Sequence, residues 1–268
     1  MELTIPSELG AALAAGQLIP YIGPGVWEGC APAHPASGRE LVAKLTEKVT
    51  VSHKLRSNLT GAAQYIENFK HRKTLNKLMS EAFEGKSQPL PLHRWLAGQS
   101  QIPLIVDVWY DAAMQLALAG RADWGQVQGV SQAEHHGEWV RYYTPAGELT
   151  TTEAAQDWRT LLYRPLGSVS PARNYIVSDS DYVEVLTEID IQTPIPEAVQ
   201  RIRGTRGFLF VGCRFTNQLE RSFARQIMKR SSGPHWALIE GELTKNEQKF
   251  LDEQGITRLA LSPAALTD

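Results

Sequence analysis

The stretch Leu18–Val26 constrains the fold of this chain more than any other part of the sequence. Residues 18–22 read Leu-Ile-Pro-Tyr-Ile, an apolar run with the length of a buried strand, and Gly23-Pro24-Gly25 follows at once. A buried strand that runs through a glycine turn toward a helix is typical of a nucleotide-binding crevice, because glycine lets backbone N–H groups approach a pyrophosphate. Pro24 has no N–H to offer, so one donor of such a cradle is replaced. A plain tight turn is the alternative interpretation of the two glycines.

Further apolar runs along the chain predict a sheet. They lie at 102–108, 160–163, 174–177, 207–212, 235–239 and 256–261. Helical segments separate most of them, among them the amphipathic segment 216–229. Long apolar strands that alternate with helices predict an α/β fold with a Rossmann-like, doubly wound and mainly parallel sheet. No repeat or linker interrupts the pattern, so we expect a single domain over residues 1–268.

Two segments differ from the rest of this pattern. Residues 54–90 predict a helical small module, with two helices inside 54–84 and prolines at 89 and 91 to end it. Residues 120–160 are polar and rich in tryptophan, and they predict a variable β-rich insertion of short strands and turns.

Composition argues against several classes of protein. The chain has 268 residues, 43% of them hydrophobic, and a net charge of -2 from 27 basic and 29 acidic residues. This balance argues against nucleic acid or an anionic membrane as the main partner. No run of about 18 apolar residues is present to span a membrane, and the N-terminus lacks the basic and apolar regions of a signal peptide. With two scattered cysteines in such a chain, we expect a cytoplasmic protein with reduced thiols.

The cysteines and histidines predict no metal site. Cys30 and Cys213 are far apart in the sequence, and no Cys-x-x-Cys pair occurs. His135 and His136 are adjacent, which on a strand points their side chains to opposite faces.

Four segments in order resemble a known family. They are Leu18-Ile-Pro-Tyr-Ile-Gly-Pro-Gly-Val26; His93-Arg-Trp-Leu-Ala97 with Ile105-Val-Asp-Val-Trp-Tyr-Asp111; Tyr163-Arg-Pro-Leu-Gly-Ser168 with Tyr175-Ile-Val-Ser178 and Asp181-Tyr182; and Phe208-Leu-Phe-Val-Gly212 with the helix at 216–224. The first is similar to the strand and Gly-Ala-Gly-x-Ser turn of the bacterial Sir2-like domain, and the second to its His-x-x-Leu-Ala and Thr-Thr-Asn-Tyr-Asp segments. The third is similar to its His-Gly strand with the Ser/Thr-x-x-Asp-Tyr helix start, and the fourth to its late strand, glycine and helix. That domain is a relative of the NAD-dependent sirtuin deacylases, and the resemblance covers roughly residues 7–240.

The departures from the family pattern bear on function. The family's Asn, which holds the nicotinamide-side ribose and the attacking water, corresponds to Trp109, and an indole offers one donor and no acceptor. The family's catalytic His corresponds to Leu166, which cannot take a proton. Pro24 and Val26 replace the Ala and Ser of the phosphate turn. The resemblance therefore implies a scaffold whose acid–base groups are substituted, and we predict no catalytic residue.

The resemblance implies a set of candidate cofactor-binding residues. They are Gly23, Gly25, Trp109, Tyr110, Asp111, Gly167, Gly212 and Arg214. Asp111 is as well explained as a helix cap after its strand. Trp109 is either a core residue or a plug of the old nicotinamide pocket, and we favour the plug. No cofactor is required by this interpretation, and NAD or ADP-ribose is the ligand that it allows.

Aromatic residues of the 120–160 segment predict a surface for a protein partner. They are Trp124, Trp139, Tyr142, Tyr143 and Trp158. Large apolar rings with one polar tip favour interfaces. Packing of this segment onto the sheet explains the same residues equally well.

The sequence favours a catalytically degenerate Sir2-like protein that acts as a protein-binding or regulatory module. A form that binds NAD or ADP-ribose without turnover and changes its affinity for a partner is compatible with it. The alternative is an active NAD-consuming enzyme, a glycohydrolase or protein deacylase, whose rebuilt site would use Asp107, Asp111 or Tyr110. Loss of a general base costs about 10²–10⁴-fold in rate, so such an enzyme would be slow.

Overall fold

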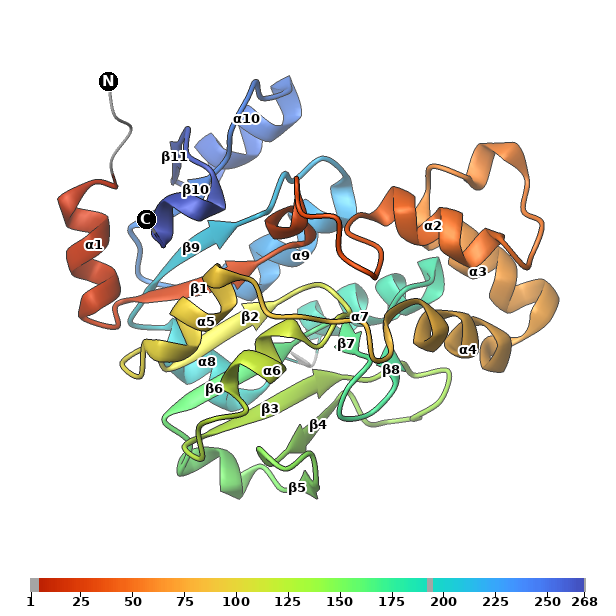
Figure 1. Ribbon diagram of the computed structural model, residues 1–268, viewed down its shortest axis with the longest axis horizontal. Coiled ribbons are helices and arrows are strands. Elements are labelled where there is room, and N and C mark those ends of the chain that lie inside the picture. The colour runs from red at the N-terminus through yellow and green to blue at the C-terminus, as the bar shows by residue number, and fades with distance from the viewer. Residues whose placement is uncertain (1–4, 192–194, 268) are drawn as a thin grey trace.

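A mainly parallel sheet forms the centre of the molecule in the computed structural model, which describes residues 5–191 and 195–267 (Figure 1). Within these residues the sheet has nine strands in the order β11-β10-β9-β1-β2-β6-β3-β4-β5. They are β1 Leu18–Ile22, β2 Leu104–Asp107, β3 Trp124–Gly129, β4 Val140–Tyr143, β5 Leu149–Thr150, β6 Thr160–Arg164, β9 Gly207–Val211, β10 His235–Leu238 and β11 Ile256–Leu259. Pairs from β11 to β3 are parallel, whereas β4 and β5 add antiparallel strands at one edge. The predicted doubly wound α/β fold is confirmed.

Helices cover both faces of this sheet. They are α1 Ser7–Ala14, α2 Gly38–Thr46, α3 Leu59–Lys70, α4 Arg72–Phe83, α5 Pro91–Gly98, α6 Ala113–Leu118, α7 Asp179–Ile191, α8 Glu197–Arg203, α9 Gln218–Met228 and α10 Lys245–Glu253. Short 3-10 helices lie at η1 Pro24–Trp27, η2 His53–Leu55, η3 Glu153–Gln156 and η4 Pro263–Leu266. In Figure 1, α5 and α6 lie in front of the sheet, and α7, α8 and α9 lie behind it.

The strand order changes direction at β1. From β1 the chain crosses one face to reach β2, and it later returns over the other face to β9, on the opposite side of β1. In open α/β sheets the crevice that binds ligands lies outside the carboxyl ends of the strands at such a switch point. By this rule, a ligand site is expected at the loops that follow β1, β2 and β9.

Local sequence explains where several helices begin. The hydroxyl of Ser37 accepts the N–H of Glu40, whose carboxylate accepts the N–H of Ala36, so Ser37 caps the start of α2. Asn217 caps α9 in the same way by accepting the N–H of Glu220. In α1 the capping position is taken by Pro6, and Ser7 is the first residue of the helix.

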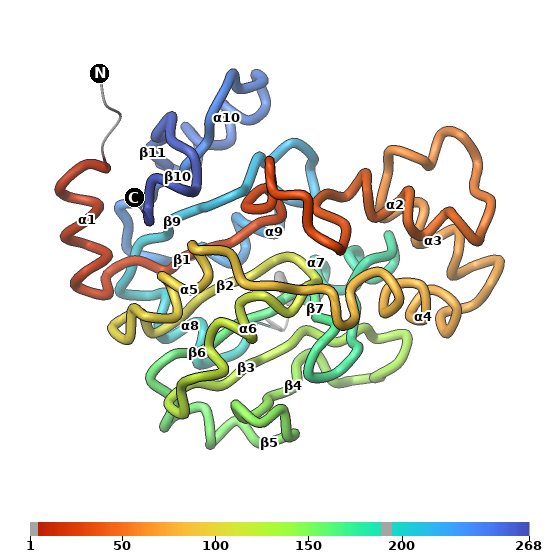
Figure 2. The backbone as a smooth tube through the Cα atoms, in the orientation of Figure 1, coloured from red at the N-terminus to blue at the C-terminus, as the bar shows by residue number. Residues whose placement is uncertain are grey.

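The predicted helical block is confirmed as the two helices α3 and α4. They join at His71 and lie with α2 at one end of the molecule (Figure 2). The domain boundaries predicted at 1 and 268, and the stretch 192–194, lie outside the described residues.

The segment 120–160 is joined to the central sheet. β3 pairs in parallel with β6, and β4 and β5 continue the same sheet outward. The strand predicted at 174–177 is shorter, because β8 (Asn174–Tyr175) pairs only with β7 (Gly167–Ser168) in a separate hairpin. Among the described residues no helix has the length and apolar character needed to cross a membrane.

Candidate functional site

The loops singled out by the sequence follow the carboxyl ends of central parallel strands. We call this end of the sheet, as distinct from its outer strands, the edge of the site. Ile22 at the end of β1 lies level with Asp107 of β2 and with Val211 of β9. The eight predicted cofactor-binding residues follow the ends of four parallel strands: Gly23, Gly25, Trp109, Tyr110, Asp111, Gly167, Gly212 and Arg214. The fold thus explains why these separate segments belong to one edge, and the contacts of each decide what it can bind.

The turn after β1 packs directly against the turn after β9. A Cβ atom added at Gly23 would lie 2.5 Å from the carbonyl oxygen of Gly212, and one added at Gly25 would lie 2.7 Å from it. A Cβ atom at Gly212, where φ is +68°, would lie 2.3 Å from the backbone nitrogen of Val26. Only glycine permits this approach, so the three glycines close the two turns onto each other.

Backbone donors of the turn after β1 are used within the protein. Gly23 and Gly25 each donate an N–H to a carbonyl at the end of β9, at 2.9 Å. Val26 donates to the carbonyl of Gly23 at 3.3 Å, and Pro24 has no N–H. The residues present at 23–26 therefore do not fit the pyrophosphate of a dinucleotide, which needs free N–H donors.

Trp109, after β2, is packed inside the molecule. Its side chain is 5% exposed, and its ring lies against Phe83 and Tyr110. The indole N–H donates to the carbonyl of Pro35 at 2.9 Å, which uses the only hydrogen-bonding group of the side chain. Trp109 therefore ties the loop after β2 to the loop before α2.

Trp27 and two histidines extend this aromatic cluster. The indole N–H of Trp27 donates to a carboxylate oxygen of Asp111 at 3.3 Å, and its ring lies 4.5 Å from that of His34 and 5.4 Å from that of His93. His93 accepts the N–H of Leu90 at 3.0 Å through Nδ1. Burial lowers the pKa of His93 to about 4, so its ring is neutral at pH 7. It serves the start of α5 and the packing of the cluster.

A buried ion pair lies beneath the loop after β2. Arg164, at the end of β6, has a fully buried side chain, and its guanidinium lies 3.0 Å from the carboxylate of Asp107. The same guanidinium donates to the carbonyls of Trp109 and Asp111, at 2.6 and 2.5 Å. Burial raises the pKa of Asp107 to about 7 although the nearby Arg164 opposes this. Arg164 therefore fixes the backbone that carries three of the predicted residues.

Arg164 was missed as a site residue at the sequence level. A signal was present, because an arginine that ends an otherwise apolar strand must find buried partners. Ser168 was missed in the same way, and its hydroxyl donates to the carbonyl of Asp111 at 3.2 Å.

Asp111 and Tyr110 also have internal partners. Asp111 accepts the N–H of Ala113, the first residue of α6, at 2.7 Å, which agrees with the helix-start interpretation of this aspartate. The hydroxyl of Tyr110 donates to the carbonyl of Ile176 at 2.8 Å. Tyr110 is 1% exposed, and burial raises its pKa well above the ordinary value.

Leu166 and Gly167 form the start of the β7–β8 hairpin. Leu166 is buried, and its carbonyl accepts the N–H of Ile176 at 2.9 Å. Gly167 has φ +77°, and a Cβ atom there would lie 2.1 Å from the carbonyl oxygen of Asn174. This glycine is therefore required by the hairpin itself, whatever else it contacts.

Arg214 is held by the loop between β10 and α10. Its guanidinium donates to a carboxylate oxygen of Glu247 at 3.2 Å and to the carbonyls of Glu240 and Glu242 at 2.7 and 2.8 Å. Its role in binding a phosphate stays a prediction.

Two surface hollows lie over other elements. One is lined by residues from 242 to 258 around α10, and the other by residues of α9 and α10. Neither lining includes any of the eight predicted cofactor-binding residues.

A family model of the SIR2-like domain matches residues 103–259, more than half of the chain. The chain belongs to the SIR2-like domain family. The match begins just before β2 and ends with β11, so it contains the loops after β2, β6 and β9.

Solved structures of Sir2 enzymes are similar to this SIR2-like chain at low identity. One, a Sir2 variant with a deacetylated p53 peptide and 3'-O-acetyl ADP-ribose, is 12% identical, with 97% of this chain and 95% of that chain covered and a TM-score of 0.43. Another, described as a structural basis for the mechanism and regulation of Sir2 enzymes, is 12% identical, with 97% and 92% covered and a TM-score of 0.40. No curated protein matches the sequence.

The prediction that the aromatic residues of segment 120–160 form an exposed surface of this SIR2-like chain is wrong. Trp124, Tyr142 and Tyr143 are buried, and a Cβ atom added at Gly125 would lie 2.3 Å from the ring of Trp158. These rings pack the 120–160 segment onto the sheet because β3 and β4 belong to it. Trp139 is half-buried and also packs against the core. The partner itself stays a prediction.

The described residues of the SIR2-like chain contain no group of three or more His, Cys, Asp or Glu side chains that could hold a metal ion. Both thiols are free. Burial raises the pKa of Cys213 well above its ordinary value, so this thiol is not activated as a nucleophile.

Proposed function

We propose that this SIR2-like chain does not turn over NAD and acts as a protein-binding or regulatory module. The observation that carries the proposal is the filled edge of the sheet, where Trp109 is 5% exposed and donates its N–H to Pro35. A substrate that approached the end of β2 would have to displace this ring and the side chains that contact it.

The backbone of the phosphate turn supports the same proposal. Its N–H groups at 23, 25 and 26 are engaged by carbonyls, and Pro24 offers none. Binding of a pyrophosphate there would break internal hydrogen bonds, and the unpaired carbonyls would oppose it.

Missing proton acceptors support it as well. Leu166 and Trp109 stand where the family pattern has its His and Asn, and neither side chain can accept a proton or a hydrogen bond from water. Asp111 already accepts hydrogen bonds from Trp27 and Ala113.

The free thiols of Cys30 and Cys213 support the proposed cytoplasmic location, where thiols stay reduced.

The test combines calorimetry of NAD and ADP-ribose binding with chromatography of released nicotinamide. We expect no nicotinamide above the protein-free blank. Binding of either nucleotide without nicotinamide would support the regulatory form of the proposal, and no binding would support a module that acts only through protein contacts.

Nicotinamide release that Asp111→Ala abolishes would overturn the proposal and favour the rebuilt enzyme. Because Asp111 also holds the start of α6, circular dichroism must show that this variant is folded. Tyr110→Phe serves as a second variant, since it removes only a hydroxyl. Asp107→Asn tests the third residue that a rebuilt site could use, and release that persists in all three variants would indicate a contaminating enzyme.

A further inference from the structure

Phe69 is an exposed aromatic side chain on the helical module. Four large hydrophobic side chains are well exposed in the described part of the chain: Phe69, Leu116, Leu149 and Val183. Phe69 is the only aromatic one, at 64% exposure, and its ring lies 4.5 Å from that of Tyr65, one helical turn earlier. Tyr65 is half-buried against the core and supports the exposed ring of Phe69, the kind of group that interfaces use as an anchor.

Two lysines lie next to this ring. Lys70 follows Phe69 directly and Lys73 comes one turn later, and both are exposed. Lys70 and Lys73 have no side-chain hydrogen bond or ion pair within the described residues. The helical module, residues 54–90, contains seven Lys and Arg against three Glu, whereas the whole chain contains 27 basic and 29 acidic residues. The helical module is therefore a basic region on a protein that is slightly acidic overall.

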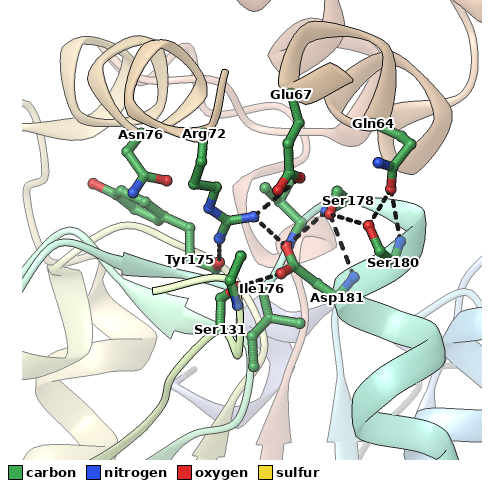
Figure 3. A network of polar contacts seen from close by, with 12 residues as sticks. Gln64, Glu67, Arg72, Asn76, Ser131, Tyr175, Ile176, Ser178, Ser180 and Asp181 are labelled. Atoms are coloured by element: carbon green, nitrogen blue, oxygen red, sulfur yellow. Dashed lines mark hydrogen bonds and ion pairs between the residues drawn. The ribbon is translucent and has the colours of Figure 1, made fainter. Parts of the chain in front are cut away.

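Arg72, between Lys70 and Lys73, points inward and anchors the helical module (Figure 3). Its guanidinium forms ion pairs with Asp181 at 2.8 Å and with Glu67 at 3.3 Å, and it donates to the carbonyl of Tyr175. Gln64 on α3 accepts the N–H of Ser180 at 2.7 Å, which adds a second link to the start of α7. These contacts tie α3 and α4 to the body of the protein.

The aspartate that receives Arg72 is itself firmly held. Asp181 is buried and accepts the N–H groups of Val177 and Ser178, at 2.9 and 3.0 Å, and the hydroxyl of Ser131 at 2.5 Å. A carboxylate with this many donors is rigid, so the arginine that pairs with it has one defined position.

The backbone between the two helices is fixed in an uncommon conformation. His71 has φ 68° and ψ 154°, a region that glycine adopts and other residues rarely do. Its N–H donates to the carbonyl of Glu67 at 2.9 Å, and its own carbonyl accepts the N–H of Thr74 at 3.0 Å. Residues 65–73, which we name the α3–α4 corner, are therefore preorganised.

We propose that the α3–α4 corner is a docking site for an acidic segment of a partner protein that carries an apolar side chain. The inference rests on the proposed function and gives it a surface. The apolar side chain would cover Phe69, and carboxylates would meet Lys70 and Lys73. Because the corner is already ordered by Arg72, binding would require little further ordering of this chain.

Charge favours a protein segment over nucleic acid as the occupant. A nucleic-acid site follows many phosphates and needs an extended basic stripe on a strongly basic domain. The corner offers two exposed lysines, Lys70 and Lys73, on a chain whose net charge is -2. A short acidic segment with one apolar anchor matches that extent.

The probe for the test is a fluorescein-labelled peptide of Asp and Glu with Leu at every fourth position, followed by fluorescence anisotropy at low ionic strength. We expect saturable binding by the full chain. Phe69→Ser should weaken it by about 10-fold, and Lys70→Glu with Lys73→Glu should weaken it by at least about as much. A peptide with Ser in place of Leu should bind no better than the Phe69→Ser variant binds the original peptide.

The matched control is Arg225→Glu with Lys245→Glu, two exposed basic residues on α9 and α10 that give the same change in net charge. This control should keep the affinity within about 2-fold of the unchanged chain. An equal loss in the control pair, or no loss in Phe69→Ser, would show unspecific charge attraction and overturn the proposal. Tighter binding of a single-stranded RNA through the same lysines, or self-association that Phe69→Ser abolishes, would overturn it in favour of those partners.

Nicotinamide release measured on the same preparations separates this inference from the proposed function. Turnover of NAD by the unchanged chain would refute the proposed function, whatever the peptide does. Absence of both turnover and peptide binding would refute the docking site alone.

Discussion

Arg164 at the edge of the sheet and Arg72 at the α3–α4 corner each pair with a buried aspartate, at 3.0 and 2.8 Å. Around Arg164 the aromatic rings turn inward, and Trp109 is 5% exposed. Near Arg72 one ring turns outward, that of Phe69, which is 64% exposed. In both regions a buried Arg–Asp pair fixes a backbone segment. Residues 107–111 with Arg164, which we call the sealed region, are covered by their neighbours. The α3–α4 corner with Asp181, which we call the presented region, carries Phe69 into solvent.

The two aspartates differ in how well their charge is satisfied. Asp107 has Arg164 and a single N–H, that of Trp109 at 3.1 Å, and burial raises its pKa to about 7. Asp181 has Arg72 together with two N–H groups and a hydroxyl. The sealed region is thus held by packing around a sparsely solvated pair, and the presented region by a dense polar network.

The largest effect is expected from Arg164→Met, which would test whether the sealed region depends on its ion pair. It leaves Asp107 buried without its partner and frees two carbonyls, so the free energy of unfolding should fall by about 4 kcal/mol. Urea unfolding measures the change. Adding Asp107→Leu should restore part of the loss, and a double variant as unstable as the single one would show that the pair is not the cause.

Acid should weaken the sealed region through His93. Its pKa is about 4 in the folded protein, below the ordinary 6.5, so the folded state binds fewer protons than the unfolded state between these values. Stability from this group is fully present above pH 6.5, falls as the pH drops through this window, and is lost by about 3 kcal/mol near pH 4.

The control for acid is His93→Asn, which can still accept the N–H of Leu90 and has no ring to protonate. Urea unfolding of both proteins at neutral and acidic pH isolates the His93 contribution. Equal acid sensitivity in the two proteins would contradict the assignment.

Arg72→Met should loosen the presented region by a smaller amount. Asp181 keeps three donors without Arg72, so the expected loss is about 2 kcal/mol. Hydrogen exchange should rise mainly in α3, α4 and the join between them, while the central strands stay protected. Lys73→Met, one residue on and exposed, is the matched control and should stay within about 0.5 kcal/mol. A uniform rise in exchange would show that the network supports the whole fold.

The smallest expected effect comes from His71→Gly at the same corner. Glycine adopts φ 68° and ψ 154° without strain, so the variant should gain about 1 kcal/mol in thermal or urea unfolding despite its more flexible unfolded state. A loss of stability would indicate that the histidine ring itself supports the corner.

The sequence was sufficient to predict the parallel sheet. Leu18–Ile22 reads as a buried strand because its residues are apolar, and all five are buried. The eight predicted residues converge because carboxyl ends of parallel strands meet at one edge. The hydrogen-bond partners of these residues could not be predicted, because Gly25 and Gly212 are far apart in the chain, as are Trp109 and Pro35. The aromatic residues of 120–160 were misplaced because interface and core favour the same rings.

The contact between Gly23, Gly25 and Gly212 has a consequence for the redesign of this domain. Replacing Pro24 by alanine would supply an N–H, but the N–H of Gly25 would still be bonded to Gly212 and the ring of Trp109 would still lie against Phe83. No single substitution would open the carboxyl end of the sheet, because each of these contacts stays closed when another is removed. A redesign that aims at a nucleotide site here must change the turn after β1 and the packing of Trp109 together.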